Sequence, residues 1–342
     1  MSHTTSQPQQ TTNLLRTAVI GAGHLGRQHA RIHANLAAEG LTQFVSVCDL
    51  NEQTARAVSG ERQTEWTCDW RDLIDRVDAV SVAVPTEAHC EIACGLLERG
   101  IHVLVEKPIS RSLAEADEMI EAARRGKSLL QVGHLERFNP AMVALRPYVK
   151  NPVYFEIHRV GEFTARSLDI DVVLDLMIHD LDIVQWLVGP KVAVTNIHAV
   201  GIAILTDKVD AANARIEFSS GAVANITASR VGTEKIRKMR FFQPHDYIAL
   251  DYTTKRASVS SLSPPTKDGA WPGVHVRNLD IIDIEPLRAE TVSFLESART
   301  GAPAAVSGSE GKTALQLALR TLERIREHAE HPGVSALSRA GQ

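Results

Sequence analysis

The chain has 342 residues, of which 44% are hydrophobic and 23% are charged, and its formal net charge at pH 7 is −4. This length exceeds what one hydrophobic core usually organises, so we expect two domains. The weak charge argues against a nucleic-acid partner, and no apolar run reaches the roughly 18 residues that would span a bilayer. Residues 1–13 lack the apolar stretch of a secretory signal, which predicts a disordered polar tail and a cytoplasmic protein.

The chain then presents an apolar run of β character, a glycine turn and an uninterrupted helical pattern. The turn reads Gly21-Ala22-Gly23-His24-Leu25-Gly26, a G-x-G-x-x-G motif in the strand-to-helix context of a dinucleotide site. Gly21 would permit the tight turn, Gly23 would let a pyrophosphate approach, and Gly26 would let the helix pack closely. Because the first N–H groups of a helix are unpaired, we expect His24 and Leu25 to line the cofactor site with these glycines. Alone, such a motif is also compatible with a turn that binds nothing.

An acidic residue at a fixed distance strengthens the cofactor prediction. A second apolar run, Phe44 to Cys48, ends at Asp49, which lies 23 residues past Gly26. A carboxylate at this spacing binds both hydroxyls of the adenosine ribose. It would repel the 2′-phosphate of NADP, and Leu50-Asn51 offers no arginine to neutralise that phosphate. The predicted cofactor is therefore NAD.

Helical and strand-like segments keep alternating as far as Gly133. We expect helices over residues 51–60, 69–76, 89–99 and 113–125, and strands over residues 78–84, 101–105 and 128–132. Short, wholly apolar strands between helices predict parallel strands that are covered on both faces. Residues 14–135 should therefore form a doubly wound, NAD-binding Rossmann domain of the α/β class.

The second half of the chain has a different pattern. A helix is expected after Asn139-Pro140 and a strongly apolar helix over residues 172–188. Strand candidates joined by short turns cover residues 153–159, 192–204, 211–218, 222–229, 235–242 and 247–252. Such strands predict an open, mostly antiparallel sheet, so residues 136–330 should form an α+β domain. Residues 260–273 should be a loop, and helices over 285–299 and 309–327 should precede a polar tail, 331–342.

Ligands of doubly wound sheets bind at the carboxyl ends of the strands, which draws attention to two stretches. One is Pro85-Thr86, with His89 one helical turn further on. The other is Glu106-Lys107-Pro108. A solvated charge pair would also explain Glu106 and Lys107, but their position favours function.

Four polar residues of the apolar helix share one face because their spacings are four, four and three: Asp171, Asp175, His179 and Asp182. They could form a solvent-facing stripe. They could equally line an active site, where a carboxylate four residues from a histidine fixes its tautomer and raises its basicity.

The cysteines suit small buried side chains in a reducing compartment. Cys90 and Cys94 lie near His89, which raises the question of a metal site. Since no second cluster would complete a tetrahedron, we predict no metal.

Together these motifs resemble the Gfo/Idh/MocA family of nicotinamide-dependent sugar oxidoreductases. The resemblance extends from Arg16 to about Glu330 and also includes Gly133, Arg137-Phe138-Asn139-Pro140 and the pair Asp175 and His179. It implies a Rossmann domain and a substrate domain whose open sheet forms a homodimer or homotetramer. It also implies that Lys107, Asp175 and His179 surround the hydroxyl being oxidised and that Pro85, Thr86, His89, Glu106 and Lys107 lie at the cofactor. A cis Lys107-Pro108 bond is expected as well.

Two features depart from the usual family pattern and bear on the substrate. His134 stands where Asn or Gln is more usual, and Asp169 to Val173 replaces a Gly-Gly pair. The run LDIDVVLDLMIHDLDIV is most similar to the branch that oxidises the 3-hydroxyl of UDP-N-acetylglucosamine for lipid A. Such a substrate needs cations for its diphosphate, and we expect them from Arg137, Arg159 and Arg166, although ion pairs with Glu156 and Glu162 would also explain these arginines. UDP-N-acetylglucosaminuronate or inositol as substrate, or a non-catalytic NAD-binding sensor, are the alternatives.

Overall fold

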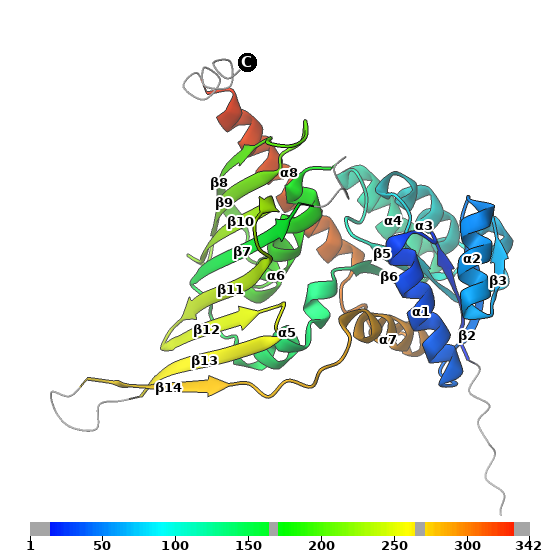
Figure 1. Cartoon of the computed structure of the whole chain (residues 1–342), viewed down its shortest axis with the longest axis horizontal. Helices are drawn as coiled ribbons and strands as arrows, with labels where there is room; N and C mark the ends of the chain where they lie inside the picture. The colour runs from blue at the N-terminus through cyan, green and yellow to red at the C-terminus, as the bar shows by residue number, and fades with distance from the viewer. Residues whose placement is uncertain (1–13, 164–169, 264–270, 332–342) are drawn as a thin grey trace, which may run out of the picture.

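The structure is a computed structural model, and it describes residues 14–163, 170–263 and 271–331. Two β-sheets organise the chain, and Figure 1 shows them side by side with helices between and around them. Within the described residues no helix is both long and apolar enough to cross a bilayer.

The first sheet is parallel throughout and has the strand order β3-β2-β1-β4-β5-β6. Its strands are β1 (Arg16–Ile20), β2 (Gln43–Cys48), β3 (Glu65–Thr67), β4 (Ala79–Val82), β5 (His102–Glu106) and β6 (Leu130–Gly133). Its connecting helices are α1 (His24–Ala38), α2 (Glu52–Arg62), α3 (His89–Leu97) and α4 (Leu113–Gly126), with short 3₁₀ turns η1 (Trp70–Leu73) and η2 (Thr86–Ala88). Strand order and connectivity are those of a Rossmann domain, which confirms the predicted fold class.

Side chains of successive strand residues enter opposite layers of this domain, as the period of a strand requires. Val103 and Val105 pack with α3 and α4, whereas Leu104 packs with α1 and with Phe294 of helix α7 (Pro286–Thr300). Both faces are thus apolar, which explains why the strands read as continuous hydrophobic runs.

The second sheet has the order β14-β13-β12-β11-β7-β10-β9-β8 and is antiparallel except where β7 meets β10. Its strands are β7 (Tyr154–Glu162), β8 (Val194–Ile202), β9 (Ala211–Phe218), β10 (Val223–Gly232), β11 (Ile236–Gln243), β12 (Asp246–Asp251), β13 (Arg256–Ser263) and β14 (Gly273–Asn278). The preceding segments are η3 (Leu135–Phe138), α5 (Pro140–Leu145) and η4 (Arg146–Tyr148).

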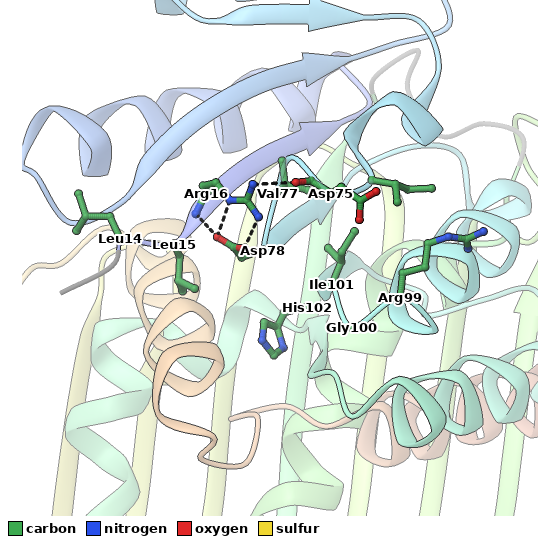
Figure 2. Close-up of a pocket in the computed structure, with 11 residues that line it drawn as sticks. Leu14, Leu15, Arg16, Asp75, Val77, Asp78, Arg99, Gly100, Ile101 and His102 are labelled. Carbon is green, nitrogen blue, oxygen red and sulfur yellow. Dashed lines mark hydrogen bonds and ion pairs between the residues drawn. The ribbon is translucent and has the colours of Figure 1, made fainter. Parts of the chain in front are cut away.

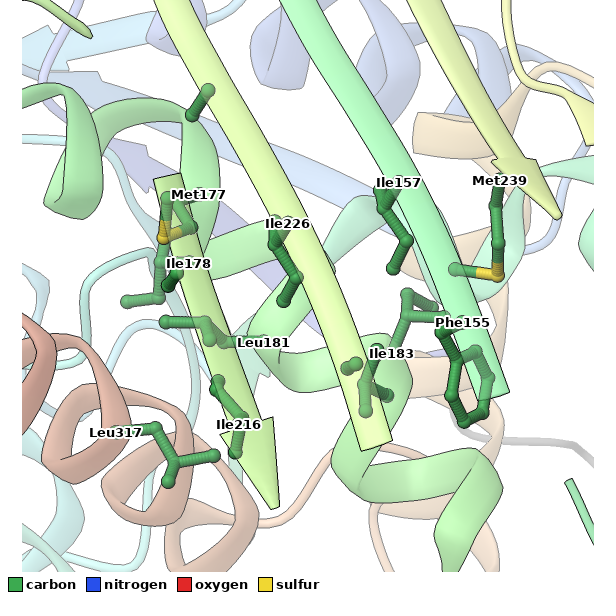
Figure 3. Close-up of a cluster of buried hydrophobic side chains, with 14 of the residues drawn as sticks. Phe155, Ile157, Met177, Ile178, Leu181, Ile183, Ile216, Ile226, Met239 and Leu317 are labelled. Atoms are coloured by element: carbon green, nitrogen blue, oxygen red, sulfur yellow. The ribbon is translucent and has the colours of Figure 1, made fainter. Parts of the chain in front are cut away.

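One face of the second sheet packs on helices α6 (Ile178–Val188) and α8 (Gly308–Ala329). Alternate residues of the strands point into this layer. Figure 3 shows strand residues Ile157, Ile226 and Met239 in one apolar cluster with Leu181 of α6 and Leu317 of α8. The opposite face carries mostly polar residues such as Asn225 and Arg240, so the helices cover one side of the sheet.

Three parts of the second half differ from the prediction. Residues 256–263 and 273–278 are paired strands, although residues 260–273 were predicted to be a loop, and residues 264–270 of that prediction lie outside the described residues. The serine-rich sequence of β13 lacks the apolar alternation that identifies a strand. It forms a strand because it pairs with β12 and β14 on either side. The apolar helix starts as a π-helical turn, η5 (Val173–Met177), before it continues as α6.

Candidate active site

The glycine turn after β1 has the geometry of a dinucleotide cradle. Gly21 adopts φ +91°, and a Cβ atom there would lie 2.3 Å from the carbonyl oxygen of Ala83. A Cβ atom at Gly26 would lie 1.8 Å from the Gly21 carbonyl oxygen, so helix and turn can approach only without side chains. Above Gly23 there is open space, since a Cβ atom there would meet nothing within 4 Å.

The start of α1 is available to an anion. Gly23 is its N-cap and no side chain caps the helix, so its first N–H groups have no side-chain acceptor. Gly23, His24 and Leu25 are exposed at this point. A helix start without a side-chain cap, beside open space, fits the diphosphate of NAD.

Asp49 is held next to this turn. Its carboxylate accepts hydrogen bonds from the backbone N–H groups of Ala22, at 2.7 Å, and of Asn51, at 2.8 Å. Among the described residues no cation pairs with it, which leaves the outer lone pairs for ribose hydroxyls and supplies nothing for a 2′-phosphate.

His89 has a different role from the one implied by the family resemblance. The ring is buried, with Nδ1 3.1 Å from the Pro108 carbonyl oxygen and Nε2 3.0 Å from that of Val84. It therefore connects the turns that follow β4 and β5, and its nitrogens do not face a cofactor. Pro85 is exposed and Thr86 half-buried at the end of β4, the edge at which the cofactor binds.

Glu106 is fixed at the end of β5 by two contacts. Its carboxylate lies 2.8 Å from Nε2 of buried His29 and accepts from the backbone N–H of Lys107 at 3.3 Å. Gly133 lies opposite it in the sheet, and a Cβ atom there would stand 3.1 Å from the Glu106 carboxylate. The Lys107–Pro108 peptide bond is cis, as expected.

Lys107 reaches across to the second domain. Its Nζ donates to the main-chain carbonyl of Asp175 at 2.8 Å and lies 3.3 Å from the Asp175 carboxylate. Asp175 sits in the π-helical turn η5, and such turns occur frequently at functional sites. The structure therefore brings a Rossmann strand end and the helix of the second domain together at Lys107.

His179 lies on the next turn and is partly exposed. Its Nδ1 is buried without a hydrogen-bond partner among the described residues, so the predicted contact from Asp175 to His179 is absent there. The Asp175 carboxylate lies instead beside Lys107. Burial, and then the positive charges of Lys107 and Arg159, hold the pKa of His179 well below its ordinary value, which keeps the ring neutral at pH 7.

A second histidine belongs to this neighbourhood. His134 directly follows β6, is buried, and has both ring nitrogens without partners among the described residues. Its Nδ1 lies 3.9 Å from the Asp182 carboxylate. Burial lowers the pKa of His134, so its ring too is neutral.

Two of the three arginines expected at the diphosphate are committed elsewhere. Arg137 forms a two-pronged pair with Asp182, at 2.6 and 2.8 Å, and a further bond to Glu310 at 2.6 Å. Arg159 is only 2% exposed. Its bonds go to Asp180 and Glu136.

The substrate-binding assignment of Arg137 and Arg159 is thus corrected, because buried carboxylates occupy both guanidinium groups. The ion pairs are not those with Glu156 and Glu162 either. The third arginine, Arg166, lies outside the described residues.

The shared face of the apolar helix is also explained. Asp182 is buried against Arg137, and the Asp171 carboxylate accepts from the backbone N–H of Val209 at 2.9 Å. This face is therefore no solvent stripe, although only Asp175 and His179 of the four residues lie at the Lys107 contact.

The cysteines form no disulfide bond with one another. All four are free, and the Sγ atoms of Cys90 and Cys94 are 3.9 Å apart on one helix. Burial raises the pKa of both Cys48 and Cys90 to about 12, so neither is a thiolate at neutral pH. In the described part of the chain, no group of three or more His, Cys, Asp or Glu residues is arranged to hold a metal ion.

A pocket of about 490 Å³ lies at the amino ends of the Rossmann strands, on the side of the sheet away from the cofactor turn and Lys107 (Figure 2). It is lined by residues that start β1 and β5, including Arg16 and His102, and by Asp78, which pairs with Arg16 at 2.8 Å. The amino ends of the strands thus form this pocket, whereas Lys107 and Asp49 follow the carboxyl ends.

Comparisons with known proteins agree with this geometry. Residues 15–134 match the model of an oxidoreductase family with an NAD-binding Rossmann fold, and residues 114–242 match the GFO/IDH/MocA C-terminal domain. UDP-N-acetylglucosamine 3-dehydrogenase of Acidithiobacillus ferrooxidans is 37% identical over 90% of this chain and 96% of its own. Myo-inositol 2-dehydrogenase of Thermotoga maritima is 27% identical over 92% of this chain and 97% of its own.

Solved structures show the same fold. The Acidithiobacillus ferrooxidans enzyme superimposes with a TM-score of 0.86 at 36% identity, covering 93% of this chain and 99% of the other. A levoglucosan dehydrogenase in complex with NADH and levoglucosan has a TM-score of 0.82 at 18% identity, covering 92% of this chain and 98% of the other.

Fold, glycine cradle and strand-end lysine together define an NAD-binding oxidoreductase. The chain belongs to the Gfo/Idh/MocA family.

Proposed function

We propose that this protein is an NAD-dependent dehydrogenase that oxidises a sugar hydroxyl to a ketone, and that the hydroxyl is that on C3 of UDP-N-acetylglucosamine. The observation that carries the dehydrogenase proposal is the contact of Lys107 with Asp175, one helical turn from a neutral, partly exposed histidine. The contact between Lys107 and Asp175 lies at the carboxyl ends of the Rossmann strands, where cofactors of this fold bind.

In the proposed reaction His179 accepts the proton of the substrate hydroxyl. A neutral imidazole has one unprotonated nitrogen that can accept it, whereas the ammonium of an ion-paired lysine cannot. Bound NAD supplies the acceptor for the hydride that leaves the same carbon. Lys107 stabilises the negative charge that develops on the substrate oxygen, and Asp175 positions Lys107 through its carbonyl and its carboxylate.

The choice of sugar rests on similarity. The Acidithiobacillus ferrooxidans relative, by its name, acts at C3 of UDP-N-acetylglucosamine, and it aligns with nearly the whole of this chain. On this proposal the 3-keto product would be aminated on the route to lipid A. UDP-N-acetylglucosaminuronate and inositol are the alternative substrates, the latter because inositol dehydrogenases are also among the relatives.

A direct assay decides between these substrates. NADH formation is followed with UDP-N-acetylglucosamine, UDP-N-acetylglucosaminuronate and inositol under identical conditions. Turnover of inositol alone would contradict the nucleotide-sugar proposal and leave the dehydrogenase intact. Absence of turnover with every compound, in protein that binds NADH, would favour a sensor.

We also propose that the open sheet of the second domain forms a homo-oligomer interface and that the protein works in the cytoplasm. Apolar side chains on the exposed side of the terminal strands support the interface, among them Val200, Ile202 and Val276. The four free cysteines suit a reducing compartment. Sedimentation equilibrium of the purified protein tests the homo-oligomer. Fractionation of cells tests the cytoplasmic location.

A further inference from the structure

Arg237 stands directly opposite Arg159 in the second sheet. The two residues are register partners on the antiparallel strands β11 and β7. Their side chains therefore lie on the same face, the one into which Met239 and Phe241 also point. Like charges in this position repel each other, so each guanidinium needs a compensating anion.

The cations around the site differ in whether they have such an anion. Lys107 pairs with Asp175, and Arg159 pairs with Asp180 and Glu136. The side chain of Arg237 forms no hydrogen bond and no ion pair with any described residue, although it is half-buried. A half-buried arginine stays protonated, so a positive charge is left there without a direct partner in the described part of the chain.

Arg159 connects Arg237 to the proposed proton acceptor, because the Arg159 guanidinium bonds Asp180, the residue that follows His179. The pKa of Arg237 is lowered first by burial and then by the charge of Arg159, while the charges of Glu136, Asp180 and Asp175 act in the opposite direction. Arg237 is in turn one of the charges that lower the pKa of His179. Arg237, which has no direct hydrogen bond or ion pair among the described residues, therefore lies in the same group of charges as the proposed catalytic residues.

We propose that Arg237 binds the phosphate group carried on the anomeric carbon of the sugar substrate. This inference rests on the proposed function and names the residue that recognises a sugar bearing a phosphate at C1. In a pyranose, C1 and C3 are separated by a single ring carbon. A cation close to the base that deprotonates the C3 hydroxyl is therefore close to a phosphate on C1.

The chemistry of the side chain suits this ligand. A guanidinium offers forked N–H donors that match two oxygens of one phosphate group. The anion would also relieve the repulsion between Arg237 and Arg159. This gives Arg237 the part that was predicted for Arg137 and Arg159, whose donors are occupied by carboxylates.

The test measures binding to NADH-saturated protein by titration calorimetry, with UDP and uridine as probes. Arg237→Met should weaken UDP binding by about 10- to 100-fold, because a charge-assisted hydrogen bond is lost. Uridine, which has no phosphate, should bind both proteins equally. Arg240→Met is the matched control, since Arg240 is exposed on the other face of the same strand, and it should leave UDP binding within about 2-fold of wild type.

Arg237→Lys keeps the charge and loses the fork, so it should bind UDP with intermediate affinity. It also serves as the second variant if Arg237→Met does not fold. Equal UDP affinities for wild type, Arg237→Met and Arg237→Lys would overturn the inference. So would a loss confined to UDP-N-acetylglucosaminuronate with UDP unaffected, since that would assign Arg237 to the uronate.

Binding and turnover separate this inference from the proposed function. Arg237-dependent UDP binding in a protein that oxidises neither nucleotide sugar would refute the proposed substrate and support the phosphate site. Turnover of UDP-N-acetylglucosamine with a KM that Arg237→Met leaves unchanged would support the function and refute the phosphate site.

Discussion

Lys107 donates a hydrogen bond from Nζ to the main-chain carbonyl of Asp175 at 2.8 Å, and this bond connects the end of β5 to the π-helical turn of the second domain. Because the acceptor is a backbone atom, the position of the amine does not depend on the Asp175 side chain alone. The ammonium is held at 14% exposure, where an interaction with a developing alkoxide is less screened than in water.

Replacing Lys107 tests that role. Lys107→Met should lower kcat by about 10²- to 10³-fold, as removal of one transition-state contact does, and should leave NADH affinity within a few-fold of wild type. Steady-state kinetics and fluorescence titration with NADH measure the two quantities. Lys312→Met is the control, since Lys312 pairs with Asp117 on the surface. An equal loss of NADH binding and turnover would make Lys107 a cofactor anchor.

Asp49 should set the preference for NAD over NADP. The unpaired outer side of its carboxylate suits ribose hydroxyls and repels a 2′-phosphate. Asp49→Ser should bring the dissociation constants for NAD and NADP closer together. Glu52 is a nearby exposed acid, and Glu52→Gln should leave their ratio unchanged. Wild-type protein that bound both dinucleotides equally would contradict the assignment.

The pH profile should report His179. Its pKa lies well below the ordinary value of 6.5 because of burial, Lys107, Arg159, His134 and Arg237. Protonation removes the acceptor, so kcat/KM should stay level as pH falls to 6.5 and decline only below it. His179→Asn should show low activity without that decline. An acidic limb at or above pH 6.5 would point to another group.

Arg159 should be needed for stability. Arg159→Met would leave the buried carboxylates of Asp180 and Glu136 without their cation, a change that typically costs about 3–5 kcal/mol. Urea unfolding measures the free energy of unfolding, with exposed Arg240→Met as control. A variant as stable as wild type but defective in substrate binding would restore the earlier substrate-binding assignment.

Glu290 on α7 should make stability fall with rising pH. Its side chain is buried, its oxygens have no hydrogen-bond partner among the described residues, and burial followed by the charge of Glu106 raises its pKa well above 4.5. In the unfolded chain Glu290 is ionised above about pH 4.3, so the folded state holds one more proton there. Stability is therefore lost as pH rises from this value toward the folded pKa.

Glu290→Gln keeps the shape and removes the titration. The variant should be more stable than wild type at pH 8 by at least about 1 kcal/mol, and the difference should vanish near pH 4. Glu296→Gln, an exposed residue on the same helix, is the control. A difference between Glu290→Gln and wild type that did not change with pH would show that Glu290 is ionised in the folded protein.

The sequence carried most of the information on the first domain. Its strands are apolar on both faces, and its cofactor turn is a contiguous motif, so local pattern was sufficient. Three-dimensional relations were harder to predict. The spacing of Asp175 and His179 suggested a contact within the helix, but Lys107, 68 positions earlier in the chain, takes that carboxylate.

The arginines show the same limit. A guanidinium that binds substrate and one that neutralises a buried aspartate look alike in sequence. Arg137 and Arg159 are distinguished from Arg237 only by which carboxylates the fold places beside them. One sequence feature could have pointed to Arg237. Side chains alternate between the two faces of a strand, so Arg237 lies on the same face of β11 as buried Met239.

Helix α8 completes both hydrophobic cores, and this bears on the order in which the protein is made. Leu315 packs in the Rossmann core, and Gly311 lies against Val132 of β6, while Leu317 and Leu322 belong to the core of the second domain. During synthesis the Rossmann sheet therefore emerges long before the helix that covers part of it. We expect a nascent chain that ends near residue 135 to expose Val132 to solvent, to chaperones and to other chains, until the last segment has left the ribosome.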